Sequence, residues 1–143
     1  YLRALAALAL EAVGVGQRAL ELAVDHAKTR RQFDKPIGTY QAVSHQVADA
    51  YVEVELARSL AYWAAWCVAE GEAQAAVAAA AAKAFAAEAA VDACERSIQV
   101  HGGIGFTQEH VLHLLYKRAQ GIASFSGPPA AQRKVVAGSL LDG

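Results

Sequence analysis

The sequence predicts an all-α fold, arranged up and down like a four-helix bundle, and three observations support this prediction. Three long segments carry apolar residues at steps of three and four, the period of an amphipathic helix. The links between them are short, so neighbouring helices should pack antiparallel. No alternation of apolar and polar residues runs long enough to predict a strand. With 143 residues, 55% of them hydrophobic and 19% charged, the chain can bury one core, and we expect one domain over residues 1–143.

The first helix should run from Leu2 to about Lys28, because its apolar residues recur every three or four positions and no proline interrupts them. The next segment, TRRQFDKPIG at residues 29–38, is charged and contains a proline and a glycine, which favours a connection. Thr39 can cap the helix that follows. This second helix should cover Tyr40 to Glu70, a rod of about 46 Å at the α-helical rise.

Gly71 should end the second helix, and a third helix should extend from Glu72 to His101. Alanine dominates this third segment and loses no side-chain entropy in a helix. A shorter helix should open at Thr107 and end near Gly121. The last helix should begin at Pro128 or Pro129, since proline is favoured in a first turn, and run to about Leu141.

Charge and composition exclude several classes of function. Thirteen Lys and Arg against fourteen Asp and Glu give a formal charge of -1, without the cationic excess that nucleic-acid binding needs. No stretch approaches the roughly 20 apolar residues that span a bilayer, since Lys83 and Glu88 interrupt the alanine-rich run. Cys67 and Cys94 lie far apart in the sequence and should be buried, reduced thiols. No signal peptide is visible, so we expect a cytoplasmic location.

A metal site is not expected. The carboxylate-bridged di-iron site of helical bundles needs Glu-x-x-His on two helices, and none of the nine glutamates has a histidine three residues later. His110 and His113 lie one turn apart beside Glu109, but two histidines without further ligands are usually surface or packing residues.

The charged connection carries three cations, Arg30, Arg31 and Lys35, and Lys28 just before it adds a fourth. Such a basic loop is most often only solvated. Arginine nevertheless suits a phosphate, because its planar fork donates two parallel hydrogen bonds, and Phe33 could anchor the loop.

A second candidate segment, GGIGFT, follows a helix and not a strand, so it lacks the context of a dinucleotide-binding fingerprint. One glycine would suffice to end the helix. Three glycines within four residues, Gly102, Gly103 and Gly105, also leave a bare backbone that a ligand or another chain can approach closely.

Taken together, these segments resemble the C-terminal domain of acyl-CoA dehydrogenases. The similarity runs from about Val13 to Leu141 and is strongest in GQRALELAVDHAKTRRQFDKPIGTYQAV at residues 16–43 and IQVHGGIGFTQEH at residues 98–110. The resemblance implies an FAD enzyme with an N-terminal helical domain and a middle β domain ahead of this bundle. The chain also has no methionine and begins at Tyr1, so we expect it to be a fragment that lacks these two domains.

The resemblance also implies site residues. In this family, R-x-x-F of one subunit reaches the FAD of its dimer mate, which places Arg30 at the pyrophosphate with Gln32, Phe33 and Gln41 beside it. The Q-x-x-G-G segment would hold the adenosine half. Gln99 would contribute its amide there, while Gly102 and Gly103 would permit close backbone approach.

The implied reaction is the α,β-desaturation of an acyl-CoA, and it needs a carboxylate base. Most members of the family carry this Glu in the loop before the last helix, where this chain has Ser126, and Ser126 has no adjacent activating base. A minority place the base on the first helix, at the position that aligns with Ala4. Glu11 lies on roughly the same helix face but two turns away, a displacement of roughly 10 Å, and is the one nearby carboxylate available to substitute.

Three functions therefore stay open at this stage. The full-length protein could be an active dehydrogenase with an unusual base, acting as a homo-oligomer on an acyl-CoA. It could instead be the base-less partner subunit of a heteromeric dehydrogenase, which still helps to form the FAD site. The third alternative is a non-catalytic helical assembly module.

Overall fold

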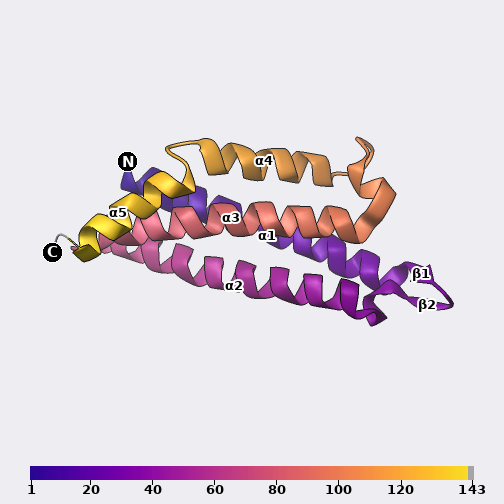
Figure 1. The fold of residues 1–143 in the computed structure, drawn as a ribbon. Coiled ribbons are helices and arrows are strands. Elements are labelled where there is room, and N and C mark those ends of the chain that lie inside the picture. Colours follow the sequence, from indigo (N-terminus) through magenta and orange to yellow (C-terminus); the bar gives the residue numbers. More distant parts are fainter. Residues whose placement is uncertain (142–143) are drawn as a thin grey trace.

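The computed structural model describes residues 1–141, and these form an antiparallel helical bundle (Figure 1). Three long helices, α1 (Leu2–Thr29), α2 (Gln41–Glu70) and α3 (Ala75–His101), run up, down and up again. Two shorter helices follow, α4 (Leu112–Ser124) and α5 (Pro129–Leu141). The predicted all-α, up-down fold is confirmed. No helix within these residues is both long and apolar enough to cross a membrane.

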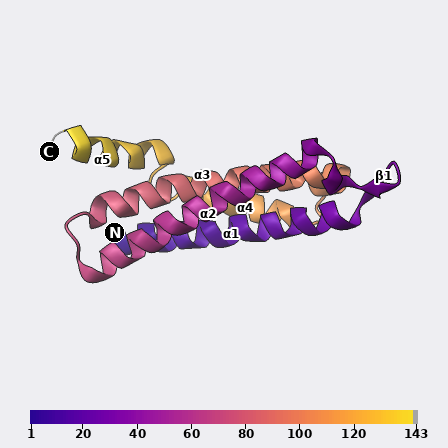
Figure 2. The same cartoon turned by 90° about the horizontal axis from the view of Figure 1, so that it is seen from below.

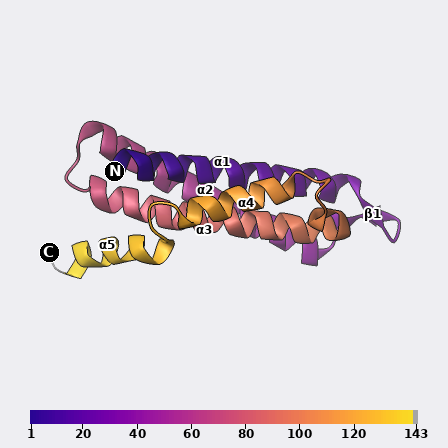
Figure 3. The ribbon, with the colours of Figure 1, turned by 90° about the horizontal axis from the view of Figure 1, so that it is seen from above.

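The α3 helix forms the centre of the bundle and contacts all four other helices. More than half of its residues are buried, most of them alanines. Small side chains allow helix axes to approach closely, so the alanine-rich segment is suited to being enclosed on several sides. Figure 3 shows α4 lying along α3 and α1, and Figure 2 shows α5 extending past the end of α3 that is remote from α4.

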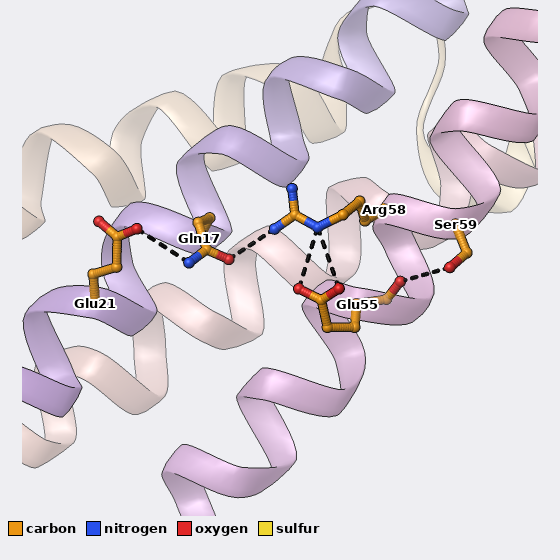
Figure 4. A network of polar contacts seen from close by, with 5 residues as sticks. All are labelled: Gln17, Glu21, Glu55, Arg58 and Ser59. Carbon is orange, nitrogen blue, oxygen red and sulfur yellow. Dashed lines mark hydrogen bonds and ion pairs between the residues drawn. The ribbon is translucent and has the colours of Figure 1, made fainter.

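A polar network joins α1 to α2 on the surface (Figure 4). The Arg58 guanidinium on α2 donates to Gln17 Oε1 on α1 at 2.8 Å and to Glu55 of its own helix at 3.2 Å. Gln17 in turn donates to Glu21 at 3.1 Å. Surface contacts of this kind contribute little energy each, but they connect two helices whose buried faces consist mainly of small residues.

The connection after α1 contains strands, which the sequence did not predict. β1 (Arg31–Gln32) pairs antiparallel with β2 (Lys35–Pro36), and a 3₁₀ turn, η1 (Ile37–Thr39), leads into α2. Two residues per strand are too few to show a period-two alternation. The predicted cap is also wrong: the Thr39 hydroxyl donates to Pro36 O at 2.7 Å, and the residue that caps α2 is Tyr40, without a side-chain bond.

Two helix starts lie later than the sequence predicts. The α3 helix begins at Ala75 and not at Glu72, because the Glu72 amide bonds back to Cys67 O at 2.9 Å around the left-handed Gly71. The α4 helix begins at Leu112 and not at Thr107. The Thr107 hydroxyl and amide both bond to Ile104 O and close a 3₁₀ turn, η2 (Gly102–Phe106).

Candidate functional site

The two motifs that the sequence singled out come together at one end of the bundle. Because α1, α2 and α3 alternate in direction, the end of α1, the hairpin, the start of α2 and the end of α3 all lie at the same end (Figure 1). Arg30, Gln32, Phe33 and Gln41 come from the first three elements. Gln99, Gly102 and Gly103 come from the end of α3 and from η2. Segments about 60 residues apart in the sequence thus form one surface.

The hairpin turn presents Phe33 to the outside. Phe33 and Asp34 both have positive φ, 50° and 64°, which makes a type I′ turn. Residues with a β-carbon rarely adopt this conformation, and it persists only where the surroundings hold it. The Arg31 guanidinium donates to Asp34 O across the turn. The Phe33 side chain is 87% exposed, so the turn holds an apolar ring in the solvent, available to a second molecule.

The base of the hairpin is fixed to the bundle. The Tyr40 hydroxyl donates to Gln32 O at 3.1 Å, and Lys35 Nζ lies 4.3 Å from the centre of the Tyr40 ring. The Arg30 amide bonds to His26 O at 2.8 Å, and the Ile37 amide bonds to Arg30 O at 2.9 Å. The backbone of Arg30 is therefore held on both sides while its side chain stays exposed.

The four cations of this segment keep their charge available. Within residues 1–141, no carboxylate forms an ion pair with Lys28, Arg30, Arg31 or Lys35, and the partner of Arg31 is a backbone carbonyl. A cluster of unpaired cations beside an exposed aromatic ring is suited to a phosphate-bearing ligand.

A stack of three histidines, which the sequence analysis missed, joins the arginine segment to the glycine segment. The His26 and His101 rings are stacked with their centres 4.3 Å apart, and the His110 ring is tilted against His101 with the two centres 4.5 Å apart. His101 is buried, and its Nδ1 lies 2.8 Å from Ser97 O. His26 stands four residues before Arg30, and His101 two residues after Gln99, so the stack connects both motifs. No periodicity links residues so far apart in the sequence.

Two histidines of the stack, His26 and His110, favour the neutral form. Burial lowers the pKa of His26, and the neighbouring His101 and Arg30 lower it further. Burial and His101 also lower the pKa of His110. Within residues 1–141, no group of three or more His, Cys, Asp or Glu side chains could hold a metal ion. His113, the other histidine of the predicted pair, lies with its Nδ1 2.7 Å from His110 O and outside the stack.

The three glycines of η2 differ in role. Gly102 has φ +63° and ends α3, which explains glycine there. A β-carbon on Gly105 would lie 2.6 Å from Ile98 O, so Gly105 is required for packing within the domain. A β-carbon on Gly102 or Gly103 would meet no atom within 4 Å, which leaves this backbone open to a ligand. Gln99 lines an adjacent hollow of about 420 Å³ between α3 and α4, together with Tyr116 and Phe106.

Ser126 lies at the other end of the bundle. It follows α4, a 13-residue helix that is about 20 Å long and starts beside the glycine turn. The Tyr1 hydroxyl donates to Ser126 O at 3.1 Å, so the start of α1, which carries Ala4, lies beside this loop. The two positions at which the resemblance implies a base are thus close together, and neither holds a carboxylate.

Glu11 is engaged elsewhere. Its carboxylate accepts two hydrogen bonds from the Arg118 guanidinium on α4, at 2.6 and 2.7 Å. These bonds lower the pKa of Glu11. A carboxylate held in this way is a weaker base than a free one.

Cys67 and Cys94 are both free and buried, which confirms the prediction of buried thiols. Burial raises the pKa of Cys94 to about 12. These thiols therefore belong to the core and not to the site.

Comparison with known proteins identifies the family. Residues 4–141 match the family model described as acyl-CoA dehydrogenase, C-terminal domain. The acyl-CoA dehydrogenase IpdE2 of Mycolicibacterium smegmatis is 39% identical over 125 residues, which are 87% of this chain and 38% of that protein.

Two solved structures have the same fold. PigA with FAD and proline superposes with a TM-score of 0.92 at 33% identity, covering 98% of this chain and 37% of that one. The ChsE4–ChsE5 complex from Mycobacterium tuberculosis gives a TM-score of 0.91 at 32% identity, over 97% of this chain and 38% of that one. The chain thus spans little more than a third of the length of these relatives. It belongs to the acyl-CoA dehydrogenase family and corresponds to the C-terminal helical domain of its members.

Proposed function

We propose that this chain is the C-terminal domain of an FAD-dependent acyl-CoA dehydrogenase and that it completes the FAD site of a neighbouring subunit. The full-length protein would carry an N-terminal helical domain and a middle β domain as well. The family match and the structural similarity to PigA, whose structure contains FAD, support this function. We propose a cytoplasmic location, which fractionation of the producing cells tests.

The residues at the hairpin end fit the chemistry of FAD. Arg30 supplies an unpaired guanidinium for the pyrophosphate, with Gln32 and Gln41 as amide donors nearby. Phe33 offers an exposed ring, and Gln99 an exposed amide beside the hollow between α3 and α4. The open backbone at Gly102 and Gly103 would admit the adenosine half. FAD, when bound, would accept the hydride from the β carbon of the acyl-CoA.

One observation carries the proposal that the site is shared between subunits. The candidate FAD residues lie at one end of the bundle, whereas the loop of Ser126 lies at the other end, beyond the length of α4. A single compact active site cannot draw on both ends of one domain. Two copies, each contributing a different end, would bring the cofactor residues of one beside the Ser126 loop of the other.

The absence of a carboxylate at Ser126 and Ala4 favours a second, more detailed candidate. In this candidate the chain is the base-less partner in a heteromeric dehydrogenase, where it helps to hold FAD and a related subunit supplies the base. Glu11 does not fill the gap, because Arg118 holds its carboxylate. The ChsE4–ChsE5 complex, which contains a chain similar to this one, supports this candidate because it joins two proteins with different names.

The experiment compares the full-length protein purified alone with the same protein co-expressed with the product of a neighbouring dehydrogenase gene. FAD absorbance and its bleaching by acyl-CoA are recorded for both preparations. Bleaching only in the co-expressed complex supports the base-less partner. Bleaching by the protein alone supports an active homo-oligomer with an unusual base. If neither preparation contains FAD, the proposed function is wrong and the assembly module is favoured.

A matched pair of variants tests the cofactor site itself. Arg30→Ala should weaken FAD binding by about tenfold to a hundredfold, the loss of one charge-assisted hydrogen bond. Arg18→Ala removes an exposed arginine in the middle of α1, away from both ends of the bundle, and should leave FAD affinity unchanged. Equal effects of the two substitutions would contradict the placement of FAD at the hairpin end.

A further inference from the structure

A lysine lies fully buried in the first half of the alanine-rich helix α3. Lys83 is 0% exposed. It is a charged residue within the alanine-rich run, and a lysine would ordinarily be expected at the surface. Within residues 1–141, no carboxylate pairs with its ammonium. A buried charge is costly unless its hydrogens are donated to good acceptors. Its acceptors therefore show what the residue does.

Of the two acceptors of Lys83, one lies in the last turn of α4 and the other in the loop that joins α4 to α5. Lys83 Nζ donates to Ala123 O at 2.9 Å and also to Gly127 O. Ala123 stands in the last turn of α4, where carbonyl groups lack a helical partner and the helix dipole favours a cation. One ammonium thus holds the chain on both sides of Ser126.

The held segment has a conformation that needs support. Ser126 has φ +58° and Gly127 has φ +94°. The first value is unfavourable for a residue with a β-carbon. Ser126 O also accepts a hydrogen bond from Gln132 Nε2 at 2.8 Å, and Gln132 is only 3% exposed. The Tyr1 hydroxyl donates to the same oxygen. Donors from α3, α5 and the start of the chain therefore converge on three carbonyls of one short loop.

We propose that Lys83 is the positioning residue of the loop 123–127: it fixes the backbone around residue 126 and so determines where the side chain at 126 points. The proposal rests on the proposed function, because the position of residue 126 matters only if relatives carry their catalytic base there. It adds that hydrogen bonds hold this loop in one geometry although residue 126 is not a carboxylate.

Hydrogen exchange of the full-length protein tests the structural part without reference to flavin chemistry. Lys83→Met keeps most of the apolar length of the side chain but removes the donors. It should speed exchange of the Phe125 amide, which bonds to Gly121 O at 3.0 Å, by about tenfold or more relative to the amides of α2. Gln132→Leu should speed exchange in the same loop. Lys134→Met, an exposed lysine on α5, is the control and should change nothing. Unchanged exchange in the loop of Lys83→Met, or equal acceleration across the whole bundle, would overturn the proposal.

A second readout separates positioning from folding. Ser126→Glu installs a carboxylate at the held position, and we expect flavin bleaching by acyl-CoA in this variant. Adding Lys83→Met should lower kcat by about tenfold and leave KM unchanged, because the carboxylate loses its orientation while the substrate contacts stay the same. Equal kcat in the single and double variants would count against Lys83. If the Ser126→Glu variant does not bleach the flavin, that result counts against the proposed function alone. The role of Lys83 is then still tested by hydrogen exchange of the loop.

Discussion

Replacing Gly105 by alanine should loosen the turn that ends α3, whereas the same replacement at Gly103 should not. The β-carbon added at Gly105 would lie 2.6 Å from Ile98 O and 3.1 Å from Ile98 Cα. The His101 Cβ also lies 3.1 Å away. Two of these three atoms belong to the backbone, and a β-carbon does not move when its side chain rotates, so η2 or the last turn of α3 must shift. Overpacking of this kind costs about 1–3 kcal/mol. That free energy corresponds to an increase of about 5-fold to 150-fold in the population of the locally open state.

Amide exchange in the full-length protein measures this directly, because protected amides exchange in proportion to the population of the open state. Peptides covering residues 97–106 report the turn, and peptides from α2 serve as the internal reference. Gly103→Ala is the matched control, since its added methyl meets no atom within 4 Å. On the proposed function, Gly103→Ala should instead reduce retention of FAD, because the methyl enters the space left for the cofactor.

Two results would refute the reasoning. Unchanged exchange in Gly105→Ala would mean that the close approach to Ile98 O does not constrain the turn. Similar acceleration in Gly103→Ala and Gly105→Ala would mean that both glycines serve packing, and the distinction between a structural and a ligand-facing glycine would be lost.

Three further predictions concern the histidine stack, the core thiols and Glu11. Because the pKa values of His26 and His110 are lowered from 6.5 in the fold, the unfolded chain binds more protons than the folded one once the pH falls through 6.5. Stability should therefore decrease below pH 6.5, down to the lowered folded pKa values, in urea titrations, and His110→Phe should flatten this dependence while the exposed His45→Gln should not. At pH 8 the buried Cys94, with a pKa of about 12, should not react with a thiol reagent until urea unfolds the domain, as followed by mass spectrometry of its peptide; rapid labelling in the native state would contradict its burial. Glu11→Gln should change the rate of flavin bleaching by no more than about twofold, since the carboxylate pairs with Arg118 at the surface, and a loss of a hundredfold or more would identify Glu11 as the base after all.

The sequence alone was sufficient for the long helices, because their stability depends on a pattern that repeats every three or four residues. It was also sufficient for the family, since the arginine and glycine segments are local motifs, and the match to residues 4–141 confirms that identification. The two late helix starts were missed for a local reason of another kind. At Glu72 and Thr107, single hydrogen bonds to Cys67 O and Ile104 O form a turn in place of the first helical turn. The helix propensities of the residues carry no information on these bonds.

Only the tertiary structure decided the roles of residues whose partners are far away in the chain. His26 and His101 stack across 75 positions of sequence, and Lys83 is buried because carbonyls 40 and 44 residues later accept its hydrogens. The same holds for Gly103 and Gly105, which are indistinguishable in the sequence. In the fold Gly103 faces open space and Gly105 faces a backbone carbonyl. Helix formation follows from short-range periodicity, whereas the position of a polar group depends on which distant atoms the packing brings within hydrogen-bond reach.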